Sequence, residues 1–105
     1  MINVYSEEAE ELIKEKEELI ILDVRTFREN KEIKIPNSIN IPLDELEWEI
    51  EDLEKYKDKE ILVYCKAGVR SSIACQMLEA EGFIKLYNLM GGVLDYKGKM
   101  IYKLY

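Results

Sequence analysis

The sequence predicts a doubly wound α/β fold. Two segments, "ELIILDVR" (residues 18–25) and "EILVYC" (residues 60–65), have continuously apolar centres, which is typical of strands covered on both faces of a parallel sheet. Segments with helical periodicity alternate with these strands along the chain. The 105 residues are enough for about one domain with one site, so we expect residues 1–105 to form a single domain.

The N-terminal third is expected to contain a helix, a strand and a short second helix. Ser6 is a suitable N-cap for a helix that carries Ala9 on its apolar face, and glutamates fill the first turn, where the helix dipole favours them. The strand over 18–25 comes next. Residues 26–34 are polar and mixed, and we assign the short helix to them.

The middle of the chain is expected to form a short strand and an amphipathic helix. The strand covers residues 38–41, between two prolines and turn residues. After Pro42, apolar residues recur at helical spacing on one narrow stripe: Leu43, Leu46, Ile50 and Leu53. Trp48 falls off this stripe.

The C-terminal half repeats the alternation of strand and helix. The strand over 60–65 leads to a helix over 71–82 that ends at Gly82. Residues 83–89 form another strand, and "MGGVLDYKGK" (90–99) forms a glycine turn that opens a short helix. One face of the helix over 71–82 is expected to carry Ile73, Ala74, Met77 and Leu78. The tail over 100–105 is apolar enough to pack on the body or in a dimer contact.

Composition excludes several classes of protein. The net charge of −7 is spread along the chain without a basic stripe, so nucleic acid is not an expected partner. The N-terminus does not resemble a signal peptide, and no segment approaches 18 apolar residues, so we expect a cytoplasmic protein without a membrane partner. In that compartment the two cysteines are expected to be thiols, and without a histidine they cannot form an ordinary zinc site. We therefore expect no metal.

The segment "YCKAGVRSS" (64–72) carries the strongest chemical signal. Cys65 ends a strand, and a helix is expected to begin about six residues later, which is where ligands bind in open α/β sheets. A loop of this kind turns successive backbone N–H groups inward, and Gly68 permits so tight a curl. With Lys66 and Arg70 nearby, all these features are expected to lower the pKa of Cys65.

Both cysteines also have a purely structural interpretation. Cys65 is either a nucleophile activated by its surroundings or a small buried apolar residue at a strand end. A Cys/His mechanism is impossible because the chain has no histidine. Cys75 lies within a predicted helix without a neighbouring cation, so we expect it to be a core or boundary residue.

The spacing in the loop favours sulfur over phosphate. Cysteine phosphatases have five residues between cysteine and arginine, whereas here only four lie between Cys65 and Arg70. The smaller cradle is tight for a tetrahedral phosphate but adequate for one bound sulfur, which extends roughly 2 Å from the cysteine. A dithiol redox site would need C-x-x-C, and Cys75 is ten positions away.

Four motifs together make the chain resemble a single-domain rhodanese, a thiosulfate sulfurtransferase-like protein. They are "LDVR" (22–25) with Glu29 following, "IPNSINIP" (35–42), "CKAGVRS" (65–71) and "LMGGVLDY" (89–96). The family's Gly-His before Ile-Pro is replaced by Ile33 and Lys34, and its tryptophan after Gly-Gly by Tyr96.

The resemblance implies a fold and a reaction. The fold is a central, mainly parallel sheet of about five strands flanked by helices. In the implied cycle, the Cys65 thiolate takes sulfur from a small anionic donor such as thiosulfate and passes it as a persulfide to cyanide or a thiol, without a cofactor. A sulfur-relay protein is a possible further partner. The loop that would hold sulfur and attract the donor is Lys66, Ala67, Gly68, Val69, Arg70 and Ser71.

Other site residues and functions stay open at this point. Asp23 and Arg25 either orient the loop or form a pair that ties loops together. Glu29 either pairs with Arg70 or is solvated, and Ser71 either caps the loop helix or donates to the persulfide. One alternative function is a rhodanese-like binding module with little catalysis, docking a partner near Trp48. The other is a small phosphatase or arsenate reductase-like enzyme.

Overall fold

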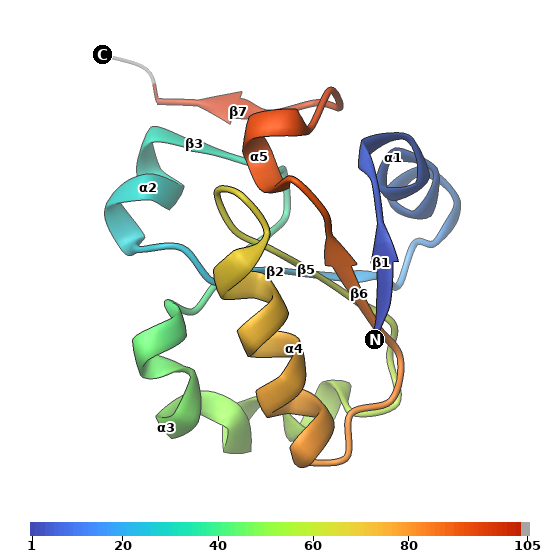
Figure 1. The fold of residues 1–105 in the computed structure, drawn as a ribbon, viewed down its shortest axis with the longest axis vertical. Helices are drawn as coiled ribbons and strands as arrows, with labels where there is room; N and C mark the ends of the chain where they lie inside the picture. Colours follow the sequence, from blue (N-terminus) through green and yellow to red (C-terminus); the bar gives the residue numbers. More distant parts are fainter. Residues whose placement is uncertain (104–105) are drawn as a thin grey trace.

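The computed structural model describes residues 1–103 and has a five-stranded parallel sheet at its centre (Figure 1). Every neighbouring pair in this sheet is parallel, which confirms the predicted α/β class. The two long apolar segments form the middle of the sheet, where both faces are covered. In spatial order the strands are β1 (Ile2–Val4), β6 (Leu86–Leu89), β5 (Ile61–Tyr64), β2 (Ile20–Asp23) and β4 (Ile39–Asn40).

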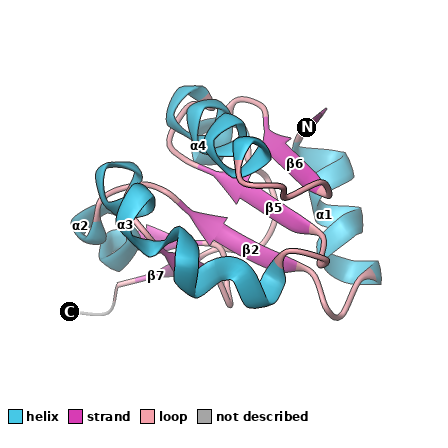
Figure 2. Ribbon diagram, turned by 90° about the horizontal axis from the view of Figure 1, so that it is seen from below, coloured by secondary structure: helices cyan, strands magenta, loops and turns pink. Residues whose placement is uncertain are grey.

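Helices cover both faces of the sheet, as a doubly wound fold requires. On one face α3 (Leu43–Leu53), extended by a 3₁₀ turn (Glu54–Tyr56), packs beside α4 (Val69–Ala80) over a core that includes Val63 and Leu78. On the other, α1 (Ser6–Glu15) packs over Ile21 and Leu62. Because side chains alternate along a strand, β2 and β5 supply both cores. Figure 2 shows β2, β5 and β6 side by side between these layers.

The remaining elements gather at the carboxyl ends of the central strands. The short helices α2 (Phe27–Glu32) and α5 (Gly92–Asp95) lie there on either side of the loop that follows β5 (Figure 1). Beside them β3 (Ile33–Lys34) pairs antiparallel with β7 (Ile101–Tyr102). The start of the apolar tail therefore packs on the body, and the part of the tail at 104–105 lies outside the described residues.

Three local predictions are wrong. Ser6 does not cap α1: Tyr5 is the N-cap, and the Ser6 hydroxyl accepts a 2.8 Å hydrogen bond from the Lys97 N–H. The helix predicted over 71–82 begins two residues earlier, because Gly68 takes a left-handed φ of 98° and starts it at Val69. The apolar face of α4 also differs from the prediction: Ile73, expected on that face, is 44% exposed, whereas Cys75 is fully buried.

The amphipathic stripe of α3 is confirmed. Leu46 and Leu53 are buried, Leu43 and Ile50 pack against the same core, and Trp48 is 78% exposed. No helix within residues 1–103 combines the length and the apolar character that crossing a bilayer requires.

Candidate active site

The sulfur of Cys65 lies at the centre of a short loop between β5 and α4. Backbone groups donate to it, among them the Gly68 N–H at 3.1 Å and the Ser71 N–H at 3.3 Å. The thiol in turn donates to the Ser71 hydroxyl at 3.4 Å. Cys65 is only 1% exposed, so a reaction partner must be slender where it meets the sulfur.

Opposing effects act on the pKa of Cys65. Burial raises it, while hydrogen bonding with the Ser71 side chain and with the backbone N–H groups of Ser71, Gly68 and Ala67 lowers it, and the lowering prevails. The loop features visible in the sequence were all expected to lower this pKa, whereas burial opposes them. The largest favourable contributions are hydrogen bonds and not the charges of Lys66 and Arg70, because dipoles that touch the sulfur outweigh charges on longer side chains.

Helix α5 closes the loop from one side. The Val93 N–H donates to the Cys65 carbonyl at 3.0 Å, and the Leu94 N–H donates to the Lys66 carbonyl at 3.1 Å. This close approach depends on Gly92, which has a φ of 56°. A Cβ at this position would lie 2.4 Å from the Cys65 carbonyl oxygen, which is too close for a side chain. The glycine pair was visible in the sequence as a turn, but its contact with the reactive loop was not predicted.

Arg70 is held by Glu29 from α2. The two side chains form a bidentate ion pair with N–O distances of 2.7 and 3.0 Å, so Glu29 pairs instead of being solvated. Glu29 also accepts hydrogen bonds from the Thr26 N–H and hydroxyl at the start of α2. The hydrogen bond from Arg70 is the main reason why the pKa of Glu29 falls to about 2.

Substitution of Glu29 by glutamine is expected to lower the free energy of unfolding by less than about 1 kcal/mol at pH 7, since the pair is partly exposed. Glutamine still accepts from Thr26 but loses the charge. Because the pKa of Glu29 is lowered, the ion pair contributes its full stabilisation above pH 4.5, the ordinary pKa of a glutamate. This stabilisation is lost as the pH falls towards about 2. Urea unfolding of both proteins from pH 6 to pH 3 measures the difference, which should shrink with acid. A difference that grows with acid would contradict the ion pair.

Asp23 and Arg25 form a buried pair that ties two loops together. The Arg25 guanidinium donates to the Asp23 carboxylate at 2.8 to 3.2 Å and to the Ile33 carbonyl at 2.6 Å. It also lies 5.4 Å from the centre of the Tyr64 ring. Both charged side chains are buried, and a buried pair with these partners links the end of β2 to β3. These contacts are those of a tie between the two segments.

Ser71 does not cap the loop helix, because Gly68 occupies the N-cap position and Ser71 lies in the first turn. Its buried hydroxyl donates to the Asn88 Oδ1 at 2.5 Å. Asn88 was not singled out in the sequence, although an amide in a strand with apolar neighbours was the available signal. Cys75 is fully buried, and burial raises its pKa to about 12, as expected of a core residue.

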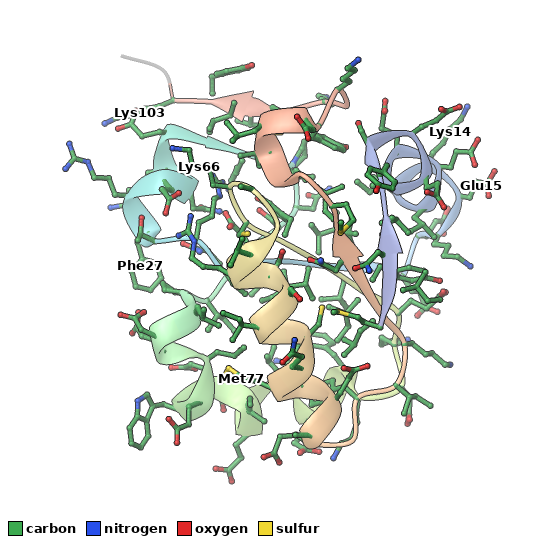
Figure 3. The ribbon with its side chains drawn as sticks, in the orientation of Figure 1. Lys14, Glu15, Phe27, Lys66, Met77 and Lys103 are labelled. Atoms are coloured by element: carbon green, nitrogen blue, oxygen red, sulfur yellow. The ribbon has the colours of Figure 1, made fainter. Side chains whose placement is uncertain are left out.

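The outer side of the loop borders a groove of about 450 Å³. Lys66 reaches into solvent on the side of α2 (Figure 3) and lines this groove together with Arg28. Ile33, Val93 and Leu94 form its apolar wall. Ala67 and Val69 are exposed at the tip of the loop. Within residues 1–103, no three side chains of the metal-binding kinds come together in a cluster that could hold an ion.

The chain is similar to known proteins of one family. The family model of the rhodanese-like domain matches residues 6–99. "Putative sulfurtransferase YtwF" of Bacillus subtilis is 36% identical over 85% of this chain and 84% of that protein. "Putative sulfur carrier protein YrkF" of the same organism is 37% identical over 79% of this chain, but the match spans only 44% of its length.

A solved structure gives the same result for the whole chain. The crystal structure of a rhodanese-like domain protein from Staphylococcus aureus superimposes with a TM-score of 0.85 at 28% identity, covering 99% of this chain and 100% of that one. Sequence and fold agree, and the chain belongs to the rhodanese-like domain family.

Proposed function

We propose that the protein is a sulfurtransferase that carries sulfane sulfur as a persulfide on Cys65. The observation that carries the proposal is the position of Cys65, a residue only 1% exposed whose sulfur accepts from the N–H donors of the loop. A terminal sulfur atom can reach it, and it then extends the side chain by roughly 2 Å into the loop. A phosphate ester presents a bulkier reacting centre.

The reaction has two steps. In the first, the Cys65 thiolate attacks the sulfane sulfur of thiosulfate, a new S–S bond forms, and the old S–S bond breaks with its electron pair leaving on sulfite. In the second, the lone pair of cyanide or of a thiolate attacks the outer sulfur. The persulfide bond breaks with its electrons returning to Cys65, which is again a thiolate.

The loop supplies the electrostatic stabilisation in both steps. The backbone N–H groups of the loop, two of which already donate to Sγ, hold the charge of the thiolate and of the outer sulfur of the persulfide. Lys66 and Arg70 attract an anionic donor and stabilise the departing sulfite.

The donor and acceptor are defined here by their chemistry. Thiosulfate and small-molecule or protein persulfides all present a slender terminal sulfur. A relative named as a sulfur carrier supports a relay in which a protein thiol is the donor or the acceptor. The proposal retains the cytoplasmic location expected from the sequence, where cysteines remain reduced.

Incubation of the reduced protein with thiosulfate is the direct test. Intact-mass measurement should show the addition of one sulfur atom per chain, and cyanide should remove it with release of thiocyanate. Hydrolysis of a phosphate ester by a protein that takes up no sulfur would contradict the proposal and favour the phosphatase alternative. A protein that does neither would favour the binding module.

A further inference from the structure

The buried amide of Asn88 lies behind the reactive cysteine, and the reaction described above does not use it. Asn88 is in β6, between β1 and β5, and is 1% exposed. An amide side chain in the middle of a parallel sheet is costly unless it is hydrogen-bonded. It has three partners, Ser71 at 2.5 Å, Asn3 at 3.2 Å and the Met90 sulfur at 3.8 Å.

Asn88 extends the hydrogen bonds of the cysteine into a chain. The Cys65 thiol donates to the Ser71 hydroxyl, which donates to the Asn88 Oδ1, and the Asn88 amide donates to the Asn3 Oδ1. The Ser71 hydroxyl has only one proton. It can serve the amide oxygen of Asn88 or the sulfur of Cys65, but not both.

We propose that Asn88 is a positioning residue that competes with the Cys65 sulfur for the single hydroxyl proton of Ser71. The inference rests on the proposed function in that it takes Cys65 as the nucleophile. When Cys65 loses its own proton, its sulfur becomes an acceptor 3.4 Å from that hydroxyl, while the amide oxygen holds the proton from 2.5 Å. Asn88 thereby keeps the thiolate less stabilised and more nucleophilic than Ser71 alone would leave it.

The competition predicts the effect of removing the amide. With leucine at position 88, the Ser71 hydroxyl is free to donate to the thiolate, and the pKa of Cys65 should fall, with about tenfold more thiolate at a pH below the alkylation midpoint. Charged groups around the loop do not change between the variants compared. They are Arg70 with Glu29, Arg25 with Asp23, the terminal amine with Glu79, and Lys66 in the loop.

The experiment is the pH profile of Cys65 alkylation, measured site by site by mass spectrometry in the full chain. Asn88→Leu should move the midpoint down, and Asn88→Val, whose β-branched side chain suits a strand, should do the same. In a Ser71→Ala background, adding Asn88→Leu should change nothing. A shift of equal size in that background would overturn the proposal, because the effect would not pass through Ser71.

Asn3→Ala is the matched control. It removes the partner on the other side of the Asn88 amide but leaves the bond to Ser71, so the midpoint should stay in place. A shift as large as that of Asn88→Leu would mean that loosened packing, and not competition for the proton, sets the pKa. If the Asn88 variants fail to fold, NMR of the wild-type protein gives the answer. The chemical shifts of the Asn88 side-chain amide should change with pH at the midpoint of Cys65 ionisation, and shifts that do not change there overturn the proposal. Because alkylation needs no sulfur donor, these results are independent of sulfur loading.

Discussion

A Cys65→Ser protein is expected to fold normally and to lose sulfur uptake from thiosulfate by at least about 10³-fold, the scale on which loss of an essential nucleophile acts. The serine oxygen can accept from the Gly68 and Ser71 N–H groups that now donate to Sγ, so the loop keeps its shape. A hydroxyl in this position stays protonated at neutral pH, and the chain has no histidine to deprotonate it. Intact-mass measurement after incubation with thiosulfate gives the result.

Cys75→Ser is the control for this prediction. The Cys75 thiol is buried, and its pKa is raised to about 12, so it is expected to take no part in sulfur uptake. The variant should load one sulfur atom like the wild type, provided that it folds with a hydroxyl in the core. Sulfur uptake by the Cys65→Ser protein would show that another residue is the nucleophile, and it would contradict the proposed mechanism.

Gly92→Ala is expected to destabilise the protein by about 2–5 kcal/mol and to abolish most sulfur loading. The alanine Cβ would lie 2.4 Å from the backbone of Cys65 and Lys66, at a φ of 56° that side chains disfavour. Backbone atoms cannot turn aside as a flexible side chain does. Relief of the clash therefore requires α5 to move off the loop, with loss of the two hydrogen bonds from Val93 and Leu94.

Gly82→Ala separates backbone strain from damage to the site. Gly82 also has a positive φ, 91°, but a Cβ there meets only the end of the Lys57 side chain at 3.1 Å. We expect a loss of about 1 kcal/mol and unchanged sulfur loading. Urea unfolding and the thiosulfate assay on both variants give the comparison. Equal loading by the Gly92→Ala protein would show that α5 does not support the loop.

Local signals explain why parts of the fold were predictable. Continuous apolar runs indicate that β2 and β5 are central strands, because an apolar strand must have both of its faces covered. The strands β1 and β7 have no such signal. Each is held by a partner distant in sequence, β6 for the first and β3 for the second. The face of α4 was assigned one position off, because Ile73 and Cys75 flank Ala74 and only the packing against the sheet distinguishes them.

By itself the sequence determined the fold class and the chemistry available to the loop. A cysteine, Gly68 and Arg70 at this spacing, together with the absence of histidine, exclude a Cys/His mechanism and leave a thiol whose activation is electrostatic or absent. Those properties belong to residue types and to short spacings, which do not depend on the rest of the chain.

Only the tertiary structure determined the environment of the Cys65 thiol. Its burial, the pairing of Arg70 with Glu29, the close approach of Gly92 and the bond from Ser71 to Asn88 all join segments far apart in the chain. Burial and hydrogen-bond direction depend on which neighbours the fold brings within about 3 Å. The residues next to Cys65 in the sequence therefore could not show that burial opposes its ionisation, or that an amide on β6 competes for the Ser71 proton.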